Sequence, residues 1–252
     1  MRTVVFALVL REMRTRISAK RGGLFWIFFE PIAHIGGMIA FITLIRGREI
    51  LGVDVTIWLI NGVVPFILLR NVSLKSMEAV AANKALFAYR QIVPFDTLIA
   101  RSIVETTIYS AVYIFLIAVV GYWGQHSIAM AKPISFFMYC GIGLLLAYSV
   151  GVLYCLIGEA FPEIKSVLRM FFWPLYLISG VIIPVWSMPS EIINIVSWNP
   201  YLHVIEGIRY SVFENYRTFP QLNILYPLKL MLGLSFVAMF FYRARRKTLV
   251  AI

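Results

Sequence analysis

The sequence predicts an all-α integral membrane protein, and composition and length are the two observations behind that prediction. Of the 252 residues, 61% are hydrophobic and 14% are charged, and the mean hydropathy is +0.84. A soluble domain carries about 25% charged and about 45–50% apolar residues, so a water-facing fold could not bury this apolar excess in one core. Because each crossing of a hydrocarbon layer about 30 Å thick requires about 20 helical residues, the chain has room for about six membrane-spanning helices. We therefore expect a single transmembrane domain over residues 1–252, without a large extramembrane domain.

The first 21 residues are expected to form an amphipathic helix that lies in the membrane surface. Phe6, Leu10, Met13 and Ile17 recur at spacings of four, three and four, which places them on one helical stripe. Most of the basic residues lie away from this stripe, as in helices that bind at the membrane interface. The alternative interpretation is a solvated basic tail. We expect no cleaved signal peptide, because charged residues follow the short apolar run at once and no small-residue cleavage site is present.

Six segments have the length and apolar composition of membrane spans. In chain order they are Gly23–Ile45, Ile57–Met77, Thr97–Tyr122, Ser135–Ile157, Val167–Ile183 and Asn223–Tyr242. With a cytoplasmic start, 17 of the 23 Lys and Arg residues fall in inside segments or toward the inner ends of spans, five fall in outside segments and one lies within the last span. This asymmetry predicts that both termini are cytoplasmic. It also accounts for the net charge of +11 without a nucleic-acid partner.

The fourth of these segments carries a stripe of small residues. Gly143, Ala147, Gly151 and Cys155 occur at every fourth position and therefore share one helix face. Such a stripe allows another helix to approach closely, which predicts helix packing and no chemistry.

No catalytic centre, metal site or nucleotide site is predicted within this chain. A P-loop requires Gly-x-x-x-x-Gly-Lys-Ser/Thr, whereas this sequence contains no Gly-Lys dipeptide. Any ATP, with its Mg²⁺, is therefore expected on a partner subunit. The histidines His34, His126 and His203 show no metal-ligand spacing. A membrane enzyme remains the alternative to a transport or binding role.

The inside connection Ala79–Asp96 is expected to contain a short amphipathic helix at residues 82–91. Apolar residues alternate there with basic and polar ones, and Pro94 ends the turn before the next span begins. The residues that would contact a cytoplasmic partner are Lys84, Leu86, Phe87, Tyr89 and Arg90. The other interpretation is an ordinary loop whose apolar residues dip into the membrane.

The outside segment Pro184–Pro220 is longer than a simple link between two spans requires. It contains two helix-like stretches and is expected to form a re-entrant helix pair that is buried in protein. Asn199 caps the second helix, which begins at Pro200, a favoured position for proline. Glu206 and Arg209 lie one turn apart on its polar face, so they can pair. The residues assigned to this feature are Asn199, Pro200, His203, Glu206 and Arg209.

Several ionisable residues lie within the predicted spans. They cost at least about 2.5–3.5 kcal/mol at the centre of a membrane helix, so they normally face a partner or a water-filled path. Glu30 and His34 are neighbours at i,i+4 in the first span. Glu105, Tyr109 and Tyr113 form a second stripe at the same spacing in the third span. These five residues are candidates for a translocation path, and a structural ion pair is the alternative role for the two glutamates.

Four stretches resemble the capsular polysaccharide export permeases of Gram-negative bacteria, the KpsM-type members of the ABC-2 exporter family. They are WIFFEPIAH (Trp26–His34), ANKALFAYRQIVPFD (Ala82–Asp96), SGVIIP (Ser179–Pro184) and NPYLHVIEGIR (Asn199–Arg209). In the last of them, Pro200, His203 and Arg209 match the family spacing Pro-x-x-His-x5-Arg, whereas Tyr201 stands where the wider family usually has an aliphatic residue or Phe. The resemblance covers essentially the whole chain.

The resemblance implies an ABC-2 exporter fold with an interface helix at residues 1–21, a coupling helix at 82–91 and periplasmic gate helices at 184–220. It implies a homodimer in the bacterial inner membrane, joined to two cytoplasmic ABC ATPase subunits that carry ATP and Mg²⁺. A periplasmic co-polymerase-type adaptor and an outer-membrane export protein are the further partners implied. The implied substrate is a lipid-anchored capsular polysaccharide that moves from cytoplasm to periplasm. The rival interpretation with the same architecture is a permease for another lipid-linked glycan, a lipid or a small molecule.

Overall fold

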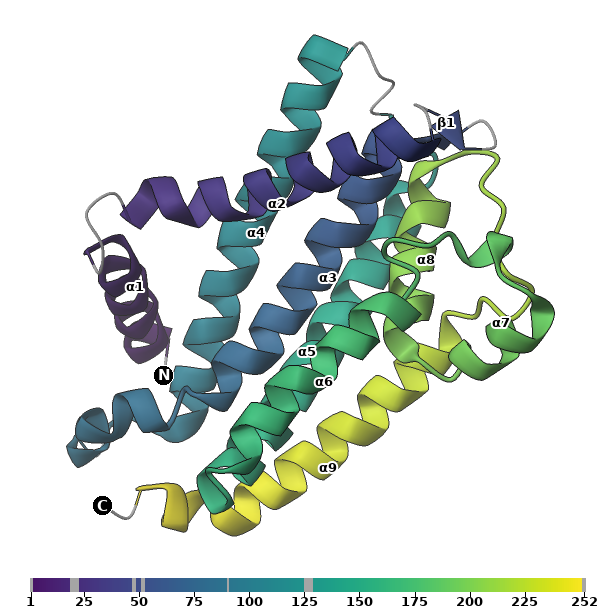
Figure 1. Cartoon of the computed structure of the whole chain (residues 1–252). Coiled ribbons are helices and arrows are strands. Elements are labelled where there is room, and N and C mark those ends of the chain that lie inside the picture. Colours follow the sequence, from purple (N-terminus) through teal and green to yellow (C-terminus); the bar gives the residue numbers. More distant parts are fainter. Residues whose placement is uncertain are drawn as a thin grey trace.

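The computed structural model describes residues 2–18, 23–46, 49–50, 53–89, 91–124 and 129–250. Within these residues the chain forms nine α-helices, two short 3-10 helices and one two-stranded ribbon (Figure 1). The α-helices are α1 (Arg2–Ser18), α2 (Gly23–Arg46), α3 (Val55–Met77), α4 (Pro94–Gly124), α5 (Pro133–Ala160), α6 (Ile164–Ile178), α7 (Ser190–Val196), α8 (Pro200–Val212) and α9 (Leu225–Val250). The 3-10 helices are η1 (Ala81–Ala88) and η2 (Val185–Ser187), and the strands are β1 (Glu49–Ile50) and β2 (Val53–Asp54).

The chain is mostly helical, as the sequence predicts, and the two short strands are an addition within one connection. They pair antiparallel, with Glu49 opposite Asp54, and they connect α2 to α3. Asp54 also caps α3, because its carboxylate accepts a hydrogen bond of 3.0 Å from the amide of Ile57. Strands of two residues are too short to leave the alternating pattern by which sequence analysis detects a strand.

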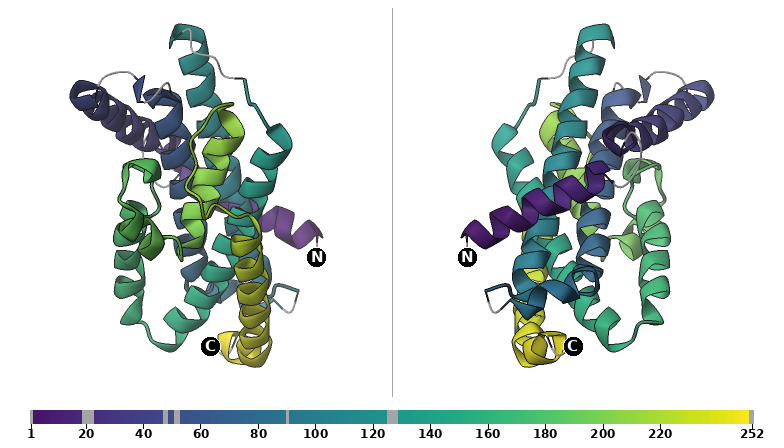
Figure 2. Two further views of the ribbon diagram at one scale, coloured as in Figure 1. Left: turned by 90° about the vertical axis from the view of Figure 1, so that its right-hand side faces the viewer. Right: turned by 90° about the vertical axis from the view of Figure 1, so that its left-hand side faces the viewer.

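The long helices α3, α4, α5 and α9 form the central bundle. α3 packs against both α4 and α5, and α5 packs against α9, so the ribbons run side by side in both views of Figure 2. The small residues on α5 permit this packing. A Cβ at Gly143 would come within 2.8 Å of Val204 on α8, and one at Gly151 within 2.7 Å of Ser76 on α3. The predicted packing role of this stripe is confirmed.

Among the residues that the structure describes, four helices are by length and composition apolar enough to cross a membrane. They contain the stretches Val55–Met77, Pro94–Tyr122, Pro133–Ala160 and Leu225–Arg246. The other two predicted spans correspond to α2, which contains the shorter apolar stretch Pro31–Ile42, and to α6. α6 stops at Ile178, short of the predicted end at Ile183, because Gly180 adopts a left-handed conformation with φ of 69°. At 1.5 Å per residue, the 15 residues of α6 extend over about 22 Å.

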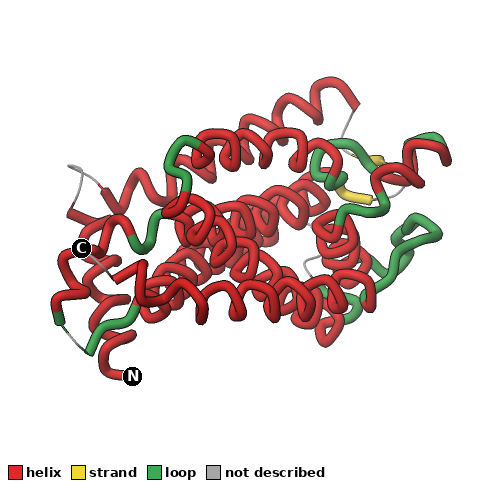
Figure 3. Tube along the Cα trace, turned by 90° about the horizontal axis from the view of Figure 1, so that it is seen from below, coloured by secondary structure: helices red, strands yellow, loops and turns green. Residues whose placement is uncertain are grey.

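One end of the bundle brings together segments from distant parts of the sequence. α1, η1 and the last turns of α9 lie at this end, opposite the ribbon of β1 and β2, in Figure 1 and again from below in Figure 3. A hydrophobic cluster there joins Phe87 of η1, Leu98 of α4, Leu156 of α5 and Leu249 of α9. We call this end of the molecule the η1 end and the opposite end the ribbon end.

Candidate functional site

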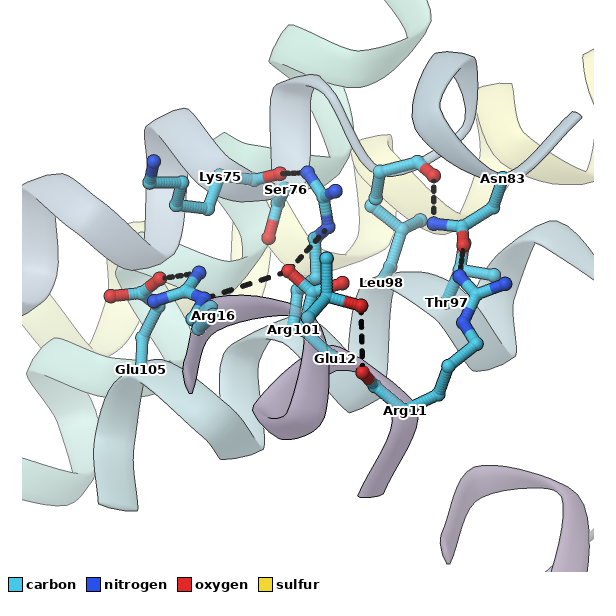
Figure 4. A network of polar contacts seen from close by, with 12 residues as sticks. Arg11, Glu12, Arg16, Lys75, Ser76, Asn83, Thr97, Leu98, Arg101 and Glu105 are labelled. Atoms are coloured by element: carbon cyan, nitrogen blue, oxygen red, sulfur yellow. Dashed lines mark hydrogen bonds and ion pairs between the residues drawn. The ribbon is translucent and has the colours of Figure 1, made fainter. Parts of the chain in front are cut away.

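A network of charged side chains attaches α1 to α4 at the η1 end (Figure 4). Arg16 of α1 forms an ion pair with Glu105 of α4, whose side chain is only 1% exposed. Oε1 of Glu12 lies 3.6 Å from Nε of Arg16 and 3.5 Å from Nε of Arg101 on α4. Because a buried carboxylate without a counter-charge is costly, these pairs fix the position of α1 on the bundle.

The segment η1 is held between α1 and the hydrophobic cluster of the η1 end. Arg11 of α1 donates a hydrogen bond to Oδ1 of Asn83, and Nδ2 of Asn83 donates to the carbonyl of Ala79 at 2.7 Å. The side chain of Phe87 is 5% exposed and packs within the cluster. Phe87 therefore anchors η1 to the bundle.

A groove separates α1 from η1 and the residues that follow it. Its volume is about 660 Å³, and its lining residues are Val4, Ala7, Leu8 and Arg11 on one side and Leu86, Ala88, Tyr89, Gln91 and Ile92 on the other. η1 ends at Ala88, before the predicted helix end at residue 91. Among the residues predicted to contact a partner, Lys84 and Tyr89 are exposed, Leu86 is half-buried, and Arg90 lies outside the described residues. The groove thus presents mainly apolar walls, with Arg11 as the basic residue of its described lining.

A cavity of about 190 Å³ lies between α2, α3, α4 and α6. Its lining residues are Pro31 and His34 from α2, Phe66, Ile67, Arg70 and Asn71 from α3, Tyr109 from α4, and Phe172, Trp173 and Tyr176 from α6. Two of the five predicted path residues, His34 and Tyr109, therefore meet in one cavity. The hydroxyl of Tyr109 accepts a hydrogen bond of 2.7 Å from Nδ2 of Asn71, which fixes the ring at the cavity wall.

The other predicted path residues are not part of this cavity lining. Glu105 pairs with Arg16, as described above. Tyr113 donates a hydrogen bond of 2.8 Å to Oδ1 of Asn61 on α3. The backbone of Glu30 belongs to α2, but its side chain lies outside the described part of the structure.

The cavity residues that sequence reasoning missed include Arg70, Asn71, Trp173 and Tyr176. Arg70 carried the same signal as Glu30, an ionisable residue within a predicted span. No signal in the sequence connected the other three, because they come to this cavity only through the packing of α3 and α6.

At the ribbon end, the fully buried Arg209 of α8 holds several segments together. Its Nη1 lies 2.8 Å from Oε1 of Glu206, which is the pair expected from the sequence. The guanidinium also donates to the carbonyls of Gly180 at 2.6 Å, Val181 at 2.9 Å and Trp58 at 3.2 Å. Its central carbon lies 3.6 Å from the centroid of the Trp58 ring. Arg209 therefore attaches α8 to α3 and to the segment that follows α6.

Glu206 is also fully buried, and Tyr216 satisfies its second oxygen. The Tyr216 hydroxyl donates to Oε2 of Glu206 at 3.0 Å and accepts from Nε1 of Trp58 at 2.9 Å. Burial raises the pKa of Glu206, while the neighbouring Arg209 and the hydrogen bond from Tyr216 act against this rise. The polar face predicted for α8 thus exists, and it is enclosed by protein.

α8 begins where the sequence predicts, with the Asn199 side chain as its cap and Pro200 as its first residue. His203, in the first turns of α8, is held in one tautomer. The amide of Asn223 donates to its Nδ1 at 3.2 Å, and its Nε2 donates to the carbonyl of Ser197 at 2.8 Å. Burial lowers the pKa of His203, and the hydrogen bond to Ser197 acts in the opposite direction. The folded protein therefore favours the neutral imidazole.

Acid is expected to loosen the α8 region through His203. Because the folded state lowers the pKa of this group, its contribution to stability is complete above the unfolded value of about 6.5 and declines as the pH falls below it. We expect a lower unfolding temperature at a pH of about 5.5 than at about 7.5, and a smaller difference in His203→Gln. Thermal unfolding of the purified protein measures both. His34→Gln, at an exposed histidine, is the matched control, and identical pH dependence in His203→Gln and wild type would contradict the prediction.

Several known proteins are similar to this chain in sequence. The family described as ABC-2 type transporter matches residues 3–213, from α1 to the end of α8. The polysialic acid transport protein KpsM of Escherichia coli is 32% identical over 249 residues, which cover 99% of this chain and 96% of that protein. The capsule polysaccharide export inner-membrane protein BexB of Haemophilus influenzae is 25% identical over 83% of this chain and 79% of its own length. The similarly named CtrC of Neisseria meningitidis is 26% identical over 94% of this chain and 91% of its own length.

Proposed function

Because this chain belongs to the ABC-2 type transporter family, we propose that it is the transmembrane subunit of an ATP-driven exporter that moves lipid-anchored capsular polysaccharide from cytoplasm to periplasm. The observation that carries this proposal is the similarity, along 99% of the chain, to a polysialic acid transport protein. Relatives named for capsule polysaccharide export in two further genera support the same substrate class. The chain is a transport permease, located in the inner membrane.

For the membrane topology we infer six spans, formed by α2, α3, α4, α5, α6 and α9, with both termini in the cytoplasm. An even number of spans agrees with the position of α1 and of the last turns of α9 at the same end of the bundle (Figure 1). The excess of Lys and Arg in the segments assigned to the inside supports the orientation. The η1 end then faces the cytoplasm and the ribbon end faces the periplasm. Residues 1–21 serve as interface helix, 82–91 as coupling helix and 184–220 as gate helices.

An ABC-2 permease works with an ABC ATPase, and we infer that two ATPase subunits bind at the η1 end of a homodimer. The groove beside η1 supports this site, because the exposed side chain of Tyr89 lines it and the exposed Lys84 belongs to the same 3-10 helix. ATP and Mg²⁺ would bind to the ATPase subunits. A second copy of the chain is supported by aromatic side chains on α6 that lack a cover within one copy: Phe171 is 50% and Trp173 is 71% exposed. A periplasmic adaptor of co-polymerase type and an outer-membrane export protein complete the proposed assembly.

We infer that the glycan moves along the face of the bundle that α2 and α6 share. Tyr109, Trp173 and Tyr176 offer aromatic surfaces there, and aromatic faces stack on the C–H groups of sugars. His34, with its exposed side chain, adds a polar group to the same lining. Glu105 has a different role in this proposal: through Arg16 it connects the interface helix to α4, so movement at the cytoplasmic surface reaches a membrane-spanning helix.

Complementation tests the proposed function. The chain and its ATPase partner are expressed in a Gram-negative strain whose own capsule export permease is deleted, and surface polysaccharide is measured. We expect surface polysaccharide to return and the intracellular pool to fall. A chain that inserts, co-purifies with the ATPase and leaves the polysaccharide inside the cell would contradict the proposal. That outcome would favour the alternative, a permease for another lipid-linked glycan, a lipid or a small molecule.

A further inference from the structure

We propose that the cavity between α2, α3, α4 and α6 binds one anionic oxygen group of the exported glycolipid, a phosphate or a carboxylate, and that Arg70 supplies the positive charge. This inference rests on the proposed function and specifies its substrate chemistry. Four observations carry it: the position of Arg70, the lack of a counter-ion among the described side chains, the polar groups beside it, and the size of the cavity.

Arg70 occupies an unfavourable position for a charge. It lies on the membrane-spanning helix α3, seven residues before the last residue, Met77, and therefore about 10 Å along the helix from that end. Its side chain is half-buried and lines the cavity. An arginine within a membrane segment normally faces an ion partner or a water-filled cavity that serves function.

Three other arginines whose described side chains reach into the protein each have a carboxylate partner. Arg16 pairs with Glu105, Arg101 pairs with Glu12, and Arg209 pairs with Glu206. Among the side chains that the structure describes, no acidic group pairs with Arg70. A guanidinium that remains charged and lacks a protein counter-ion favours binding of an oxyanion from outside the chain.

The groups around Arg70 can complete an oxyanion site. Within the described part of the chain the Tyr176 hydroxyl donates to Sδ of Met38 at 3.4 Å, and a thioether is a weak acceptor, so this hydroxyl can turn to a better one. His34 and Trp173 add ring nitrogens that can donate hydrogen bonds. Arginine binds carboxylate and phosphate through two parallel hydrogen bonds, which gives such a site geometric selectivity.

The walls and the volume of the cavity suit a single anionic group. Phe66 packs edge to face against Phe172 and Tyr176, with ring centroids 6.5 Å and 5.1 Å apart. These apolar walls lower the local dielectric and strengthen an ion pair inside. A cavity of about 190 Å³ has room for one phosphate or one acidic sugar. Because Trp173 is 71% exposed, the cavity opens toward the face between α2 and α6.

Binding measurements on the complete complex test this site. The chain with its ATPase partner is placed in nanodiscs of neutral lipid and titrated with two anionic probes. Short-chain phosphatidylglycerol carries a phosphate without a glycan, and a sialic acid tetramer carries carboxylates without a lipid. Maltotetraose is the uncharged control probe. We expect Arg70→Gln to weaken the binding of at least one anionic probe by about tenfold or more, and Arg70→Lys to retain most of it.

The pattern of losses distinguishes the sources of the anion. Loss for phosphatidylglycerol alone assigns the site to the lipid anchor, and loss for the tetramer alone assigns it to the sugar chain. Arg169→Gln is the matched control, because Arg169 is an exposed arginine of α6 that pairs with Glu78 outside the cavity. Equal binding of both probes by wild type and Arg70→Gln would overturn the proposal, and so would an equal loss in Arg169→Gln.

Two further measurements separate this proposal from other failures. If Arg70→Gln does not fold, Tyr176→Phe keeps the ring packing and removes one donor, and we expect it to weaken binding about threefold or more. Unchanged binding in that variant would then overturn the proposal. Complementation with the wild-type chain reports on export separately. A wild-type chain that binds anions through Arg70 and does not export polysaccharide would contradict the proposed function and leave the anion site in place.

Discussion

Glu206→Ala should abolish surface polysaccharide and lower the unfolding temperature, whereas Glu214→Ala should leave both close to wild type. The first substitution leaves Arg209 with its charge in a site where both side chains are 0% exposed. Breaking a buried pair from one side costs about 3–5 kcal/mol. Glu214 lies just beyond the same helix and is exposed, so its removal strands no charge. Surface polysaccharide and thermal unfolding are measured at matched protein levels.

A double variant separates gating from stability. Glu206→Leu with Arg209→Met removes both charges, and such apolar replacements are often neutral or stabilising. Here the carbonyls of Gly180 and Val181 lose their donor, so we expect only partial recovery of stability. Recovered stability without recovered export would assign a gating role to the pair. Near-normal and equal export in Glu206→Ala and Glu214→Ala would remove that role from α8.

Lys84→Glu combined with Tyr89→Ala should separate the chain from its ATPase and abolish export. Tyr89 lines the groove beside η1, and Lys84 is exposed on η1, where its Nζ lies 3.9 Å from Oε2 of Glu159. Both side chains are exposed, so their replacement does not open the core. Loss of a central aromatic contact together with a reversed charge typically weakens an interface by more than tenfold. Co-purification of the ATPase and surface polysaccharide measure the effect, with thermal unfolding as the test of folding.

Two control variants accompany the test of ATPase binding. Arg217→Glu reverses an exposed charge in the loop that follows α8, and it should not affect binding of the ATPase. Phe87→Ala removes a side chain that is 5% exposed, and we expect it to destabilise the protein by about 3–5 kcal/mol. Normal co-purification in Lys84→Glu with Tyr89→Ala would show that the ATPase binds elsewhere.

Local patterns allowed the helices and their caps to be predicted from the sequence. Residues three apart on a helix must be neighbours, so the pairing of Glu206 with Arg209 followed from spacing alone and is confirmed at 2.8 Å. The start of α8 at Asn199 and Pro200 is likewise a local matter of one side chain and the first helical turn. The family resemblance also rested on short contiguous stretches of residues.

Partners far apart in the chain were decided by the tertiary structure. Periodicity shows which face of a helix a residue occupies, but it does not show which other helix packs there. Glu105 therefore could not be connected to Arg16, which lies 89 positions away. For the same reason Phe87, which the pattern placed at a partner surface, was found in the hydrophobic cluster of the η1 end.

The clearest example is the space that holds the guanidinium of Arg209. Gly62 of α3 makes room for this guanidinium, because a Cβ at this position would overlap Nη2 of Arg209. The sequence alone determined that the chain is a helical membrane protein with an acidic and a basic residue one turn apart. Only the packing of α8 against α3 decided that this pair is sealed in protein, because burial depends on the neighbouring helix and on the small residue that it presents at the contact.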